Sequence, residues 1–252
     1  MSSMFYYSAH QASSISLSGV SGWDTSSLED MSYIFNNFGF NSGTVNIGNL
    51  GNWDVSKVTN MRYAFFGSGA MASDWYIGDF TNWQTGNVTD MAYLFGSTGM
   101  LDNTWSIGNL NNWNTAKVTD MAYMFYGCGY NSPSTNFGTL ANWQTGNVTN
   151  MEYMFSGTAY NVSTFTLNVT NWDTSKVTNM SNMFSDCGYM ATSWSIGTLT
   201  NWKTGNVTKM DKMFNNACYN GSTFNIGNIG NWNVSKVTTM SLMFYNSGYN
   251  NA

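Results

Sequence analysis

Apolar and polar residues follow one pattern that recurs along the whole chain. Tryptophan returns every 30 residues, with one step of 29, and an aliphatic residue, a methionine and a phenylalanine follow it at fixed distances. The tryptophans are Trp23, Trp53, Trp83, Trp113, Trp143, Trp172, Trp202 and Trp232. A fixed period of this length is typical of repeat architectures. The sequence therefore predicts a single repeat domain over 1–252, with a partial unit at 1–22 and Trp-led units that start at 23, 53, 83, 113, 143, 172, 202 and 232.

The first half of each unit has the spacing of a helix. Met91, Leu94 and Phe95 lie at i, i+3 and i+4, which brings side chains onto one helical face. Thr89 stands where an N-cap accepts a backbone hydrogen bond, and Gly99 stands where a chain leaving a helix often needs positive φ. We predict a helix of about two to three turns, too short to be stable without packing against its neighbours.

The second half of each unit has the period of a strand. Apolar and polar residues alternate at 105–107, 194–196 and 224–226 before a Gly. One strand and one helix in each repeat describe a solenoid whose units contact only their neighbours. The asparagines just before the tryptophans recur where a side-chain amide can bond the next coil, and they predict a structural ladder that includes Asn52, Asn82, Asn112 and Asn142.

Composition narrows the range of partners. The chain has 252 residues, 42% of them hydrophobic but only 8% charged, and its net charge is −5. Eight Lys and Arg residues form no basic stripe, so we expect no nucleic-acid partner. No run of about 18 apolar residues occurs, and residues 1–20 lack the basic and apolar regions of a signal peptide, so we expect no membrane insertion and no signal peptide in the chain as given.

Chemically reactive residues are sparse. His10 is the single histidine, and the three cysteines, Cys128, Cys187 and Cys218, are not arranged as a metal site. Carboxylates occur as single residues in the units rather than as the close pair that glycosidases need. We therefore expect no enzyme activity, no catalytic residue, no metal and no cofactor.

The repeat resembles a known family. The segment from Asn171 to Phe184, with Asn, Trp, Val, Thr, Met and Phe at fixed positions, is similar to the BspA-like leucine-rich-repeat surface proteins, the DUF285 family. The resemblance covers nearly the whole chain. It implies an α/β fold, a leucine-rich-repeat-like solenoid of eight ~30-residue units, each with one short parallel strand and one short helix. It also implies an extracellular or cell-surface location and a role in adhesion and protein binding.

Two sets of aromatic residues are candidates for core or contact positions. The repeat tryptophans, above all Trp53, Trp83, Trp113, Trp143, Trp172 and Trp202, are favoured as a packed ladder, with a stacking platform for sugars as the alternative. Tyrosines follow each predicted helix in the later units, and we expect a partly exposed stripe that contacts a partner. These are Tyr130, Tyr160, Tyr189, Tyr219 and Tyr249. The alternative is that their rings only close the loop between helix and strand.

Three functions are compatible with these patterns. The first is a non-enzymatic recognition or adhesion solenoid that binds a protein or glycan surface. The alternative is a self-assembling protein that forms head-to-tail filaments, because Met1 and Phe5 keep the internal pattern and the last unit ends after its predicted helix. A second alternative is an ice- or flat-surface-binding protein, since small hydroxyl and amide residues such as Asn46, Ser106 and Thr166 are expected to face outward from the strands.

Overall fold

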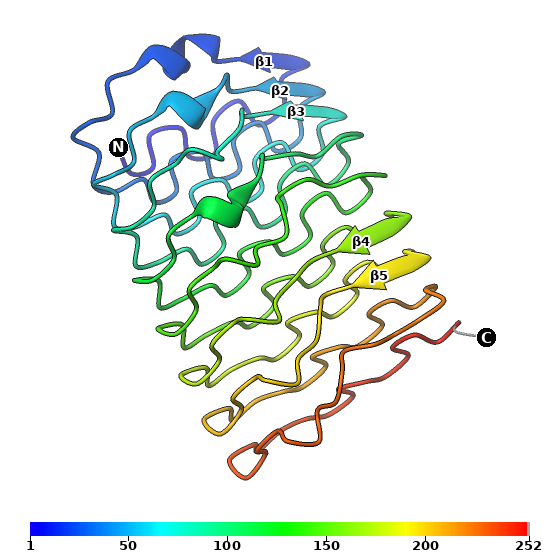
Figure 1. Cartoon of the computed structure of the whole chain (residues 1–252). Helices are drawn as coiled ribbons and strands as arrows, with labels where there is room; N and C mark the ends of the chain where they lie inside the picture. Colours follow the sequence, from blue (N-terminus) through cyan, green and yellow to red (C-terminus); the bar gives the residue numbers. More distant parts are fainter. Residues whose placement is uncertain (251–252) are drawn as a thin grey trace.

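The computed structural model describes residues 1–250, so residues 251 and 252 of the predicted domain lie outside the described residues. The chain winds in successive coils that stack from the N-terminus to the C-terminus (Figure 1). In chain order the elements are β1 (Ser14–Ser16), the 3₁₀ helix η1 (Ser18–Gly22), β2 (Thr44–Asn46), η2 (Leu50–Asn52), β3 (Asp74–Tyr76), η3 (Leu110–Asn112), β4 (Thr164–Thr166) and β5 (Ser193–Ser195). The remainder of residues 1–250 consists of turns, bends, single bridges and chain without regular secondary structure.

The strands are parallel and offset by one repeat. β2 pairs with β1 and β3, and Ile15, Val45 and Trp75 occupy equivalent buried positions in the three strands. β4 pairs with β5 in the same way. The predicted strand at 194–196 is confirmed as β5, which begins and ends one residue earlier. The one at 105–107 is reduced to a single bridge between Ser106 and Asn136, and the one at 224–226 forms no strand.

Pro133 gives a physical reason why pairing with the coil that follows 105–107 is limited to this one bridge. At the equivalent position of other coils a backbone N–H donates to the preceding coil, as from Ser73 to the Gly43 oxygen and from Thr192 to the Ser163 oxygen, both at 3.0 Å. Proline has no N–H and cannot make this bond. The sheet therefore loses a hydrogen bond in the coil that follows 105–107.

The predicted helices are wrong: residues 1–250 contain no α-helix. The N–H groups of Met91, Tyr93 and Phe95 donate to carbonyls of the next coil, at 2.8–3.1 Å, and the N–H of Leu94 donates to the carbonyl of Met91 in a tight turn. Tyr93 has φ of 61°, which no right-handed helix accommodates. A helix would use its N–H groups for hydrogen bonds within its own coil. Consecutive turns are favoured here because they leave alternate N–H groups free to bond the next coil.

The core is formed by like residues stacked on like. Phe35, Phe65, Phe95, Phe125, Phe155, Phe184, Phe214 and Phe244 form one column, with ring centroids 5.4–6.0 Å apart. Met91, Leu94 and Phe95, which the sequence assigned to one apolar face, are all fully buried. The i, i+3, i+4 spacing thus identified the buried residues correctly although their backbone is not helical.

Each end of the described stack exposes apolar side chains that the inner coils bury. Met4 is 52% exposed in the first coil, and Phe244 is 43% exposed in the last, whereas Phe214 is fully buried. Head-to-tail association remains a prediction. None of the helices within residues 1–250 has both the length and the apolar character needed to cross a bilayer.

Candidate functional site

The tryptophan ladder lies inside the stack. Trp53, Trp83, Trp113, Trp143, Trp172 and Trp202 are 2–3% exposed. Each indole N–H donates to a carbonyl of the preceding coil, as from Trp53 to Val20 at 2.8 Å and from Trp113 to Phe80 at 2.9 Å. Both the faces and the polar edges of these rings are therefore occupied, and the ladder offers no platform to a sugar.

The predicted asparagine ladder needs correction. Asn52, Asn82, Asn112 and Asn142 are exposed, and none of their side chains makes a hydrogen bond to the described part of the chain. The reason lies in the tryptophans. The carbonyl of Leu50, for example, accepts hydrogen bonds from the backbone N–H of Trp53 at 3.0 Å and from the indole N–H of Trp83 at 2.9 Å. This carbonyl therefore needs no hydrogen bond from an asparagine side chain.

The predicted tyrosine stripe forms a continuous stack, which we call the C-terminal tyrosine column. It consists of Tyr130, Tyr160, Tyr189, Tyr219 and Tyr249, with adjacent ring centroids 4.4–5.1 Å apart. The first four are half-buried, and Tyr249 is 64% exposed. Because ring faces are stacked on one another, the column presents mainly ring edges and hydroxyl groups to solvent.

A second column, which we call the N-terminal tyrosine column, was not predicted. It consists of Tyr33, Tyr63, Tyr93, Tyr123 and Tyr153, with centroids 4.1–4.9 Å apart. Burial raises the pKa of Tyr123 to about 12, so its phenol stays protonated at neutral pH. Its signal in the sequence is a tyrosine ten residues after the tryptophan in units 23 to 143. That position was treated as part of a helix and passed unnoticed.

A hollow lies beside the C-terminal tyrosine column, and Tyr126 connects it to the N-terminal column. Tyr126 packs with its ring steeply inclined to Tyr123 and Tyr153 of the N-terminal column, and it lines a cavity of about 300 Å³ together with Tyr130 and Tyr160 of the C-terminal column. The other lining residues are Met100, Gly127, Ser156, Gly157 and Asp186. Small residues between two rows of tyrosines produce the hollow, because they leave the space that larger side chains would fill.

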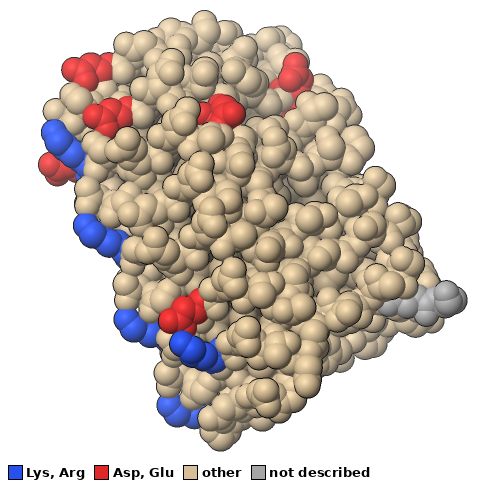
Figure 2. Space-filling view, in the orientation of Figure 1, with Lys and Arg blue, Asp and Glu red and all other residues tan. Residues whose placement is uncertain are grey.

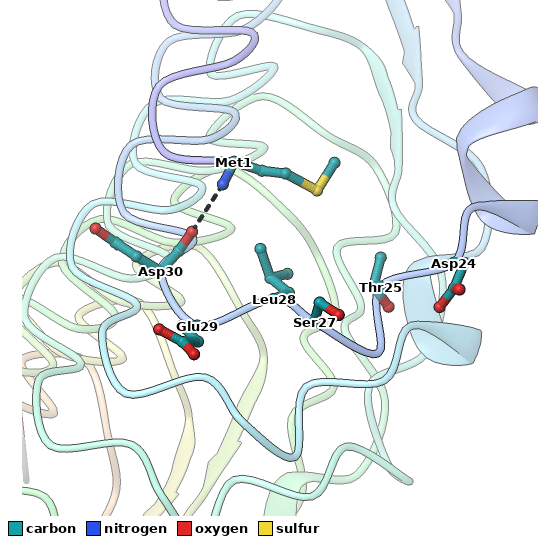
Figure 3. A pocket seen from close by; sticks show the side chains of 7 residues that line it. All are labelled: Met1, Asp24, Thr25, Ser27, Leu28, Glu29 and Asp30. Atoms are coloured by element: carbon teal, nitrogen blue, oxygen red, sulfur yellow. Dashed lines mark hydrogen bonds between the residues drawn. The ribbon is translucent and has the colours of Figure 1, made fainter.

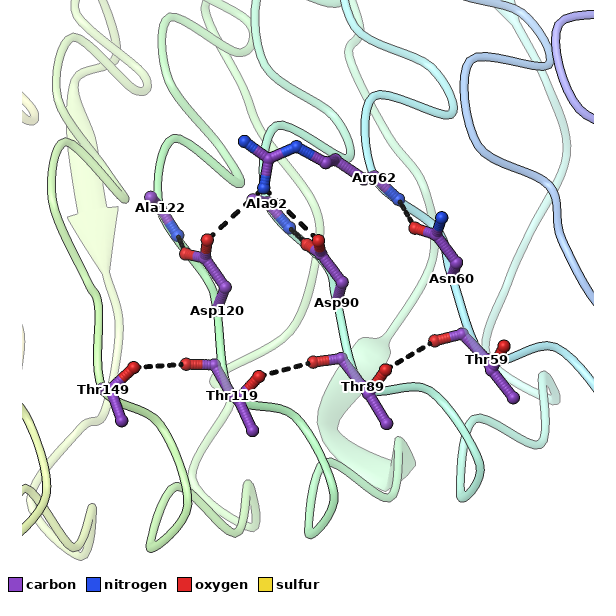
Figure 4. Close-up of polar contacts among 10 residues, drawn as sticks. All are labelled: Thr59, Asn60, Arg62, Thr89, Asp90, Ala92, Thr119, Asp120, Ala122 and Thr149. Atoms are coloured by element: carbon purple, nitrogen blue, oxygen red, sulfur yellow. Dashed lines mark hydrogen bonds and ion pairs between the residues drawn. The ribbon is translucent and has the colours of Figure 1, made fainter.

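Arg62 lies beside the N-terminal tyrosine column and forms ion pairs with carboxylates of the next two coils. Its Nη1 lies 3.3 Å from Asp90 and 3.4 Å from Asp120, one and two coils further along (Figure 4). Its guanidinium carbon also lies 5.4 Å from the ring centroids of Tyr63 and Tyr93. The two aspartates with stacked tyrosines therefore already hold one guanidinium group of this chain.

A ladder of threonines runs beside these aspartates. Each hydroxyl donates to the carbonyl of the preceding threonine, as from Thr89 to Thr59 at 3.1 Å and from Thr119 to Thr89 at 3.2 Å (Figure 4). Thr149, Thr178, Thr208 and Thr238 continue it. The backbone N–H of each makes the same contact, so the ladder links neighbouring coils along the stack.

A larger hollow lies at the first coil but has no catalytic arrangement. Asp24, Glu29 and Asp30 line a space of about 380 Å³ with Met1, Thr25, Ser27 and Leu28, and the terminal amine of Met1 donates to the Asp30 carbonyl at 3.3 Å (Figure 3). Hydrogen bonds from Ser26 lower the pKa of Asp24, which is the opposite of what a general acid needs near neutral pH. The described residues also contain no cluster of three or more His, Cys, Asp or Glu side chains suited to a metal ion.

Comparison with known proteins identifies the family to which the repeat belongs. No curated protein and no solved structure matches the chain. The sequence model of a family described as "Mycoplasma protein of unknown function, DUF285" matches residues 1–128, 37–159, 98–195 and 159–252. These overlapping matches span every coil, and the chain therefore belongs to the DUF285 family.

Proposed function

We propose that this protein is a non-enzymatic recognition solenoid that binds the surface of a partner macromolecule through its two tyrosine columns. The observation that carries the proposal is the pair of half-buried aromatic columns, which Tyr126 connects at a hollow beside the C-terminal column. Tyrosine offers large contact area at low cost in side-chain entropy. Stacking of each ring on its neighbours restricts the ring further before any partner binds.

The ring geometry favours a polypeptide partner over a glycan. A sugar ring packs on the open face of an aromatic ring, but inside the columns both faces are covered by neighbouring tyrosines. The exposed hydroxyls and ring edges suit the amide and aliphatic groups of a protein surface. Location at a cell surface and a role in adhesion are part of this proposal and rest on the family resemblance.

Binding to an array of immobilised peptides and an array of immobilised oligosaccharides tests it. The double variant Tyr189→Ala and Tyr219→Ala removes two exposed ring edges outside the hollow, and Ser195→Ala, on the outer face of β5, is the matched control. We expect saturable binding to peptides that falls at least tenfold in the double variant only. Saturable binding to oligosaccharides alone, binding to neither array, or equal loss in the control would each overturn the proposal.

The outer face of the strands supports a second candidate, binding to ice. Ser14 and Ser16 in β1, Thr164 and Thr166 in β4, and Ser193 and Ser195 in β5 all point outward in exposed pairs. In the adjacent strands β4 and β5, which are about 4.8 Å apart and have outward residues two positions apart, these hydroxyls form a regular two-dimensional array. Thermal hysteresis of the wild type, lost in Thr166→Lys and retained in the double tyrosine variant, would support it, and no hysteresis in the wild type would refute it.

A further inference from the structure

The hollow beside the C-terminal tyrosine column has the side chains of a cation site. Tyr126, Tyr130 and Tyr160 provide aromatic rings, Met100 provides a polarisable thioether, and Asp186 provides a carboxylate. No lysine or arginine lines the hollow. Aromatic rings attract cations through their negatively charged faces, and a nearby carboxylate adds to that attraction.

One ring presents an open face to the hollow. Both faces of Tyr123 are covered, by Tyr93 at 4.4 Å and by Tyr153 at 4.6 Å. Tyr126 stands at 63° to Tyr123 and 77° to Tyr153, so it can only meet their edges. Neither ring is stacked face to face on Tyr126, so the part of the Tyr126 ring that lines the hollow is not covered by these tyrosines.

The carboxylate of Asp186 is held in place without a cation. It accepts hydrogen bonds from the Ser185 hydroxyl and from the Asn216 amide, both at 2.9 Å. Among residues 1–250 the ion pairs join Arg62 to Asp90 and Asp120, and Lys203 to Asp173, so Asp186 pairs with none of the described basic side chains. It is half-buried, and this strengthens its attraction for a positive charge relative to an exposed carboxylate.

Arg62 is an example, within this chain, of a cation held by tyrosine rings and carboxylates. Its guanidinium group lies beside two stacked tyrosines and against two aspartates. The hollow repeats the tyrosines and a carboxylate but lacks the arginine. Guanidinium is planar and weakly hydrated, so it packs on a ring and bonds a carboxylate at the same time, which an ammonium does less well.

We propose that the hollow lined by Tyr126, Tyr130, Tyr160 and Asp186 binds the guanidinium group of an arginine side chain on a partner polypeptide. The inference rests on the proposed recognition function and identifies the chemical group at the centre of the contact. The guanidinium lies against the open face of Tyr126, and its N–H groups donate to Asp186. Arg62 is a partial counterpart within the chain: its guanidinium pairs with carboxylates beside tyrosines, although those rings are stacked on one another and offer no open face.

Nuclear magnetic resonance of the full chain, with ¹³C-labelled methionine methyl groups, tests the site. Met100 lines the hollow, and its signal is assigned by its loss in Met100→Leu. Titration with N-acetyl-arginine amide is expected to shift this signal saturably, with at least fivefold weaker binding in Asp186→Asn and in Tyr126→Leu. Asp54→Asn, at an exposed carboxylate outside the hollow, is the matched control and should bind like the wild type.

Other probes separate guanidinium from its alternatives. N-acetyl-lysine amide should bind at least threefold more weakly, and N-acetyl-glutamine amide should give no saturable shift. A non-saturating response to arginine, an unchanged affinity in Asp186→Asn with the fold intact, or tighter binding of tetramethylammonium than of arginine would overturn the proposal.

The two proposals fail in distinguishable ways. If the peptide array is bound through Tyr189 and Tyr219 but arginine amide leaves Met100 unchanged, the guanidinium site is wrong and the recognition function stands. If arginine amide binds but no array is bound, the recognition function is wrong. Replacing arginine by alanine in a bound peptide should weaken its binding to the wild-type protein at least fivefold. The same replacement should not weaken its binding to the Asp186→Asn variant.

Discussion

At the scale of single residues, polar groups inside the stack are satisfied mainly by the neighbouring coil, and the exceptions are informative. Thr25 Oγ1 and Asp102 Oδ2 are the buried side-chain atoms without a hydrogen-bond partner in residues 1–250. Asp102 is 1% exposed, and burial raises the pKa of its carboxyl. Ser42 and Ser132 occupy the equivalent position in nearby coils, so a smaller neutral side chain fits there.

Asp102→Ser should stabilise the protein at neutral pH. A carboxyl whose folded pKa is raised adds stability below its unfolded pKa and loses it as the pH rises through the folded value. Removing it should raise the free energy of unfolding by on the order of 1 kcal/mol at pH 7 to 8, with little gain near pH 4. Denaturant unfolding of both proteins across this pH range measures the effect.

The exposed Asp54 supplies the control with the opposite sign. Hydrogen bonds from Ser56 lower its pKa, so its contribution is present at neutral pH and is lost as the pH falls through the lowered value. Asp54→Ser should therefore weaken the protein slightly at pH 7 and not at low pH. Equal pH profiles for Asp102→Ser and the wild type would show that Asp102 is not strained by burial.

Cys128 should be nearly unreactive in the folded protein. Its thiol is fully buried and donates to the Phe95 carbonyl at 2.8 Å, and burial raises its pKa from 9.0 to about 12. Three pKa units reduce the thiolate fraction about a thousandfold. With Cys187 and Cys218 replaced by Ala, a thiol reagent at pH 8 should label Cys128 only after unfolding, and rapid labelling in native buffer would contradict the buried position.

At the scale of elements, the sequence predicts which side chains are buried better than it predicts the backbone that carries them. Period-two alternation located β5, but the same alternation at 105–107 forms only a single bridge, to the coil that contains Pro133. The helical spacing located the core, but it cannot distinguish an α-helix from consecutive turns. The C-terminal tyrosine column was visible as a repeated residue after each predicted helix, whereas the hollow depends on a fold that brings Tyr126 beside Tyr153.

Lys212→Gly distinguishes the turns from a helix. Lys212 is exposed with φ of 53°, a conformation that strains any residue with a β-carbon by about 1–2 kcal/mol. Glycine removes this strain but increases the entropy of the unfolded chain, so we expect stability to be unchanged or raised by up to about 1 kcal/mol. In a helix the same change would lower stability by about 1 kcal/mol.

Lys209→Gly is the matched control for this measurement. Lys209 is also an exposed lysine, but it lies in the bridges with Asn179 and Thr239 and has no positive φ. Glycine there should lower the free energy of unfolding by roughly 0.5–1 kcal/mol. A similar loss at both lysines, measured by denaturant unfolding, would argue against the turn conformation at Lys212.

At the scale of the whole molecule, stacking in register places equal positions of all coils side by side, which is favourable for aromatic rings and unfavourable for equal charges. The position four residues after each tryptophan shows the solution, since it alternates as Lys57, Asn87, Lys117, Asn147, Lys176, Asn206 and Lys236. Basic side chains are accordingly spaced along one edge of the stack (Figure 2). The alternation fits descent from a duplicated pair of units, and the structure adds a physical reason for keeping it.

The asparagines in this series separate and bind the lysines. Asn147 donates its amide to the Ala116 carbonyl at 2.7 Å and accepts from Lys176 Nζ at 2.5 Å. Lys117 and Lys236 make the same contact with Asn87 and Asn206, each at 2.7 Å. Alternate coils therefore place like charges about two coil spacings, roughly 10 Å, apart, which is close to the Debye length at physiological salt.

Asn147→Lys should destabilise the stack in a salt-dependent way. It places a third ammonium between Lys117 and Lys176, one coil from each, and removes the hydrogen bonds of the amide. We expect a loss of about 1 kcal/mol at 20 mM salt that falls by at least half at 500 mM, because exposed charges are screened. Asn147→Ser removes the same hydrogen bonds without adding charge, so its smaller loss should not change with salt. If both variants respond equally to salt in denaturant unfolding, charge separation is not what the alternation provides.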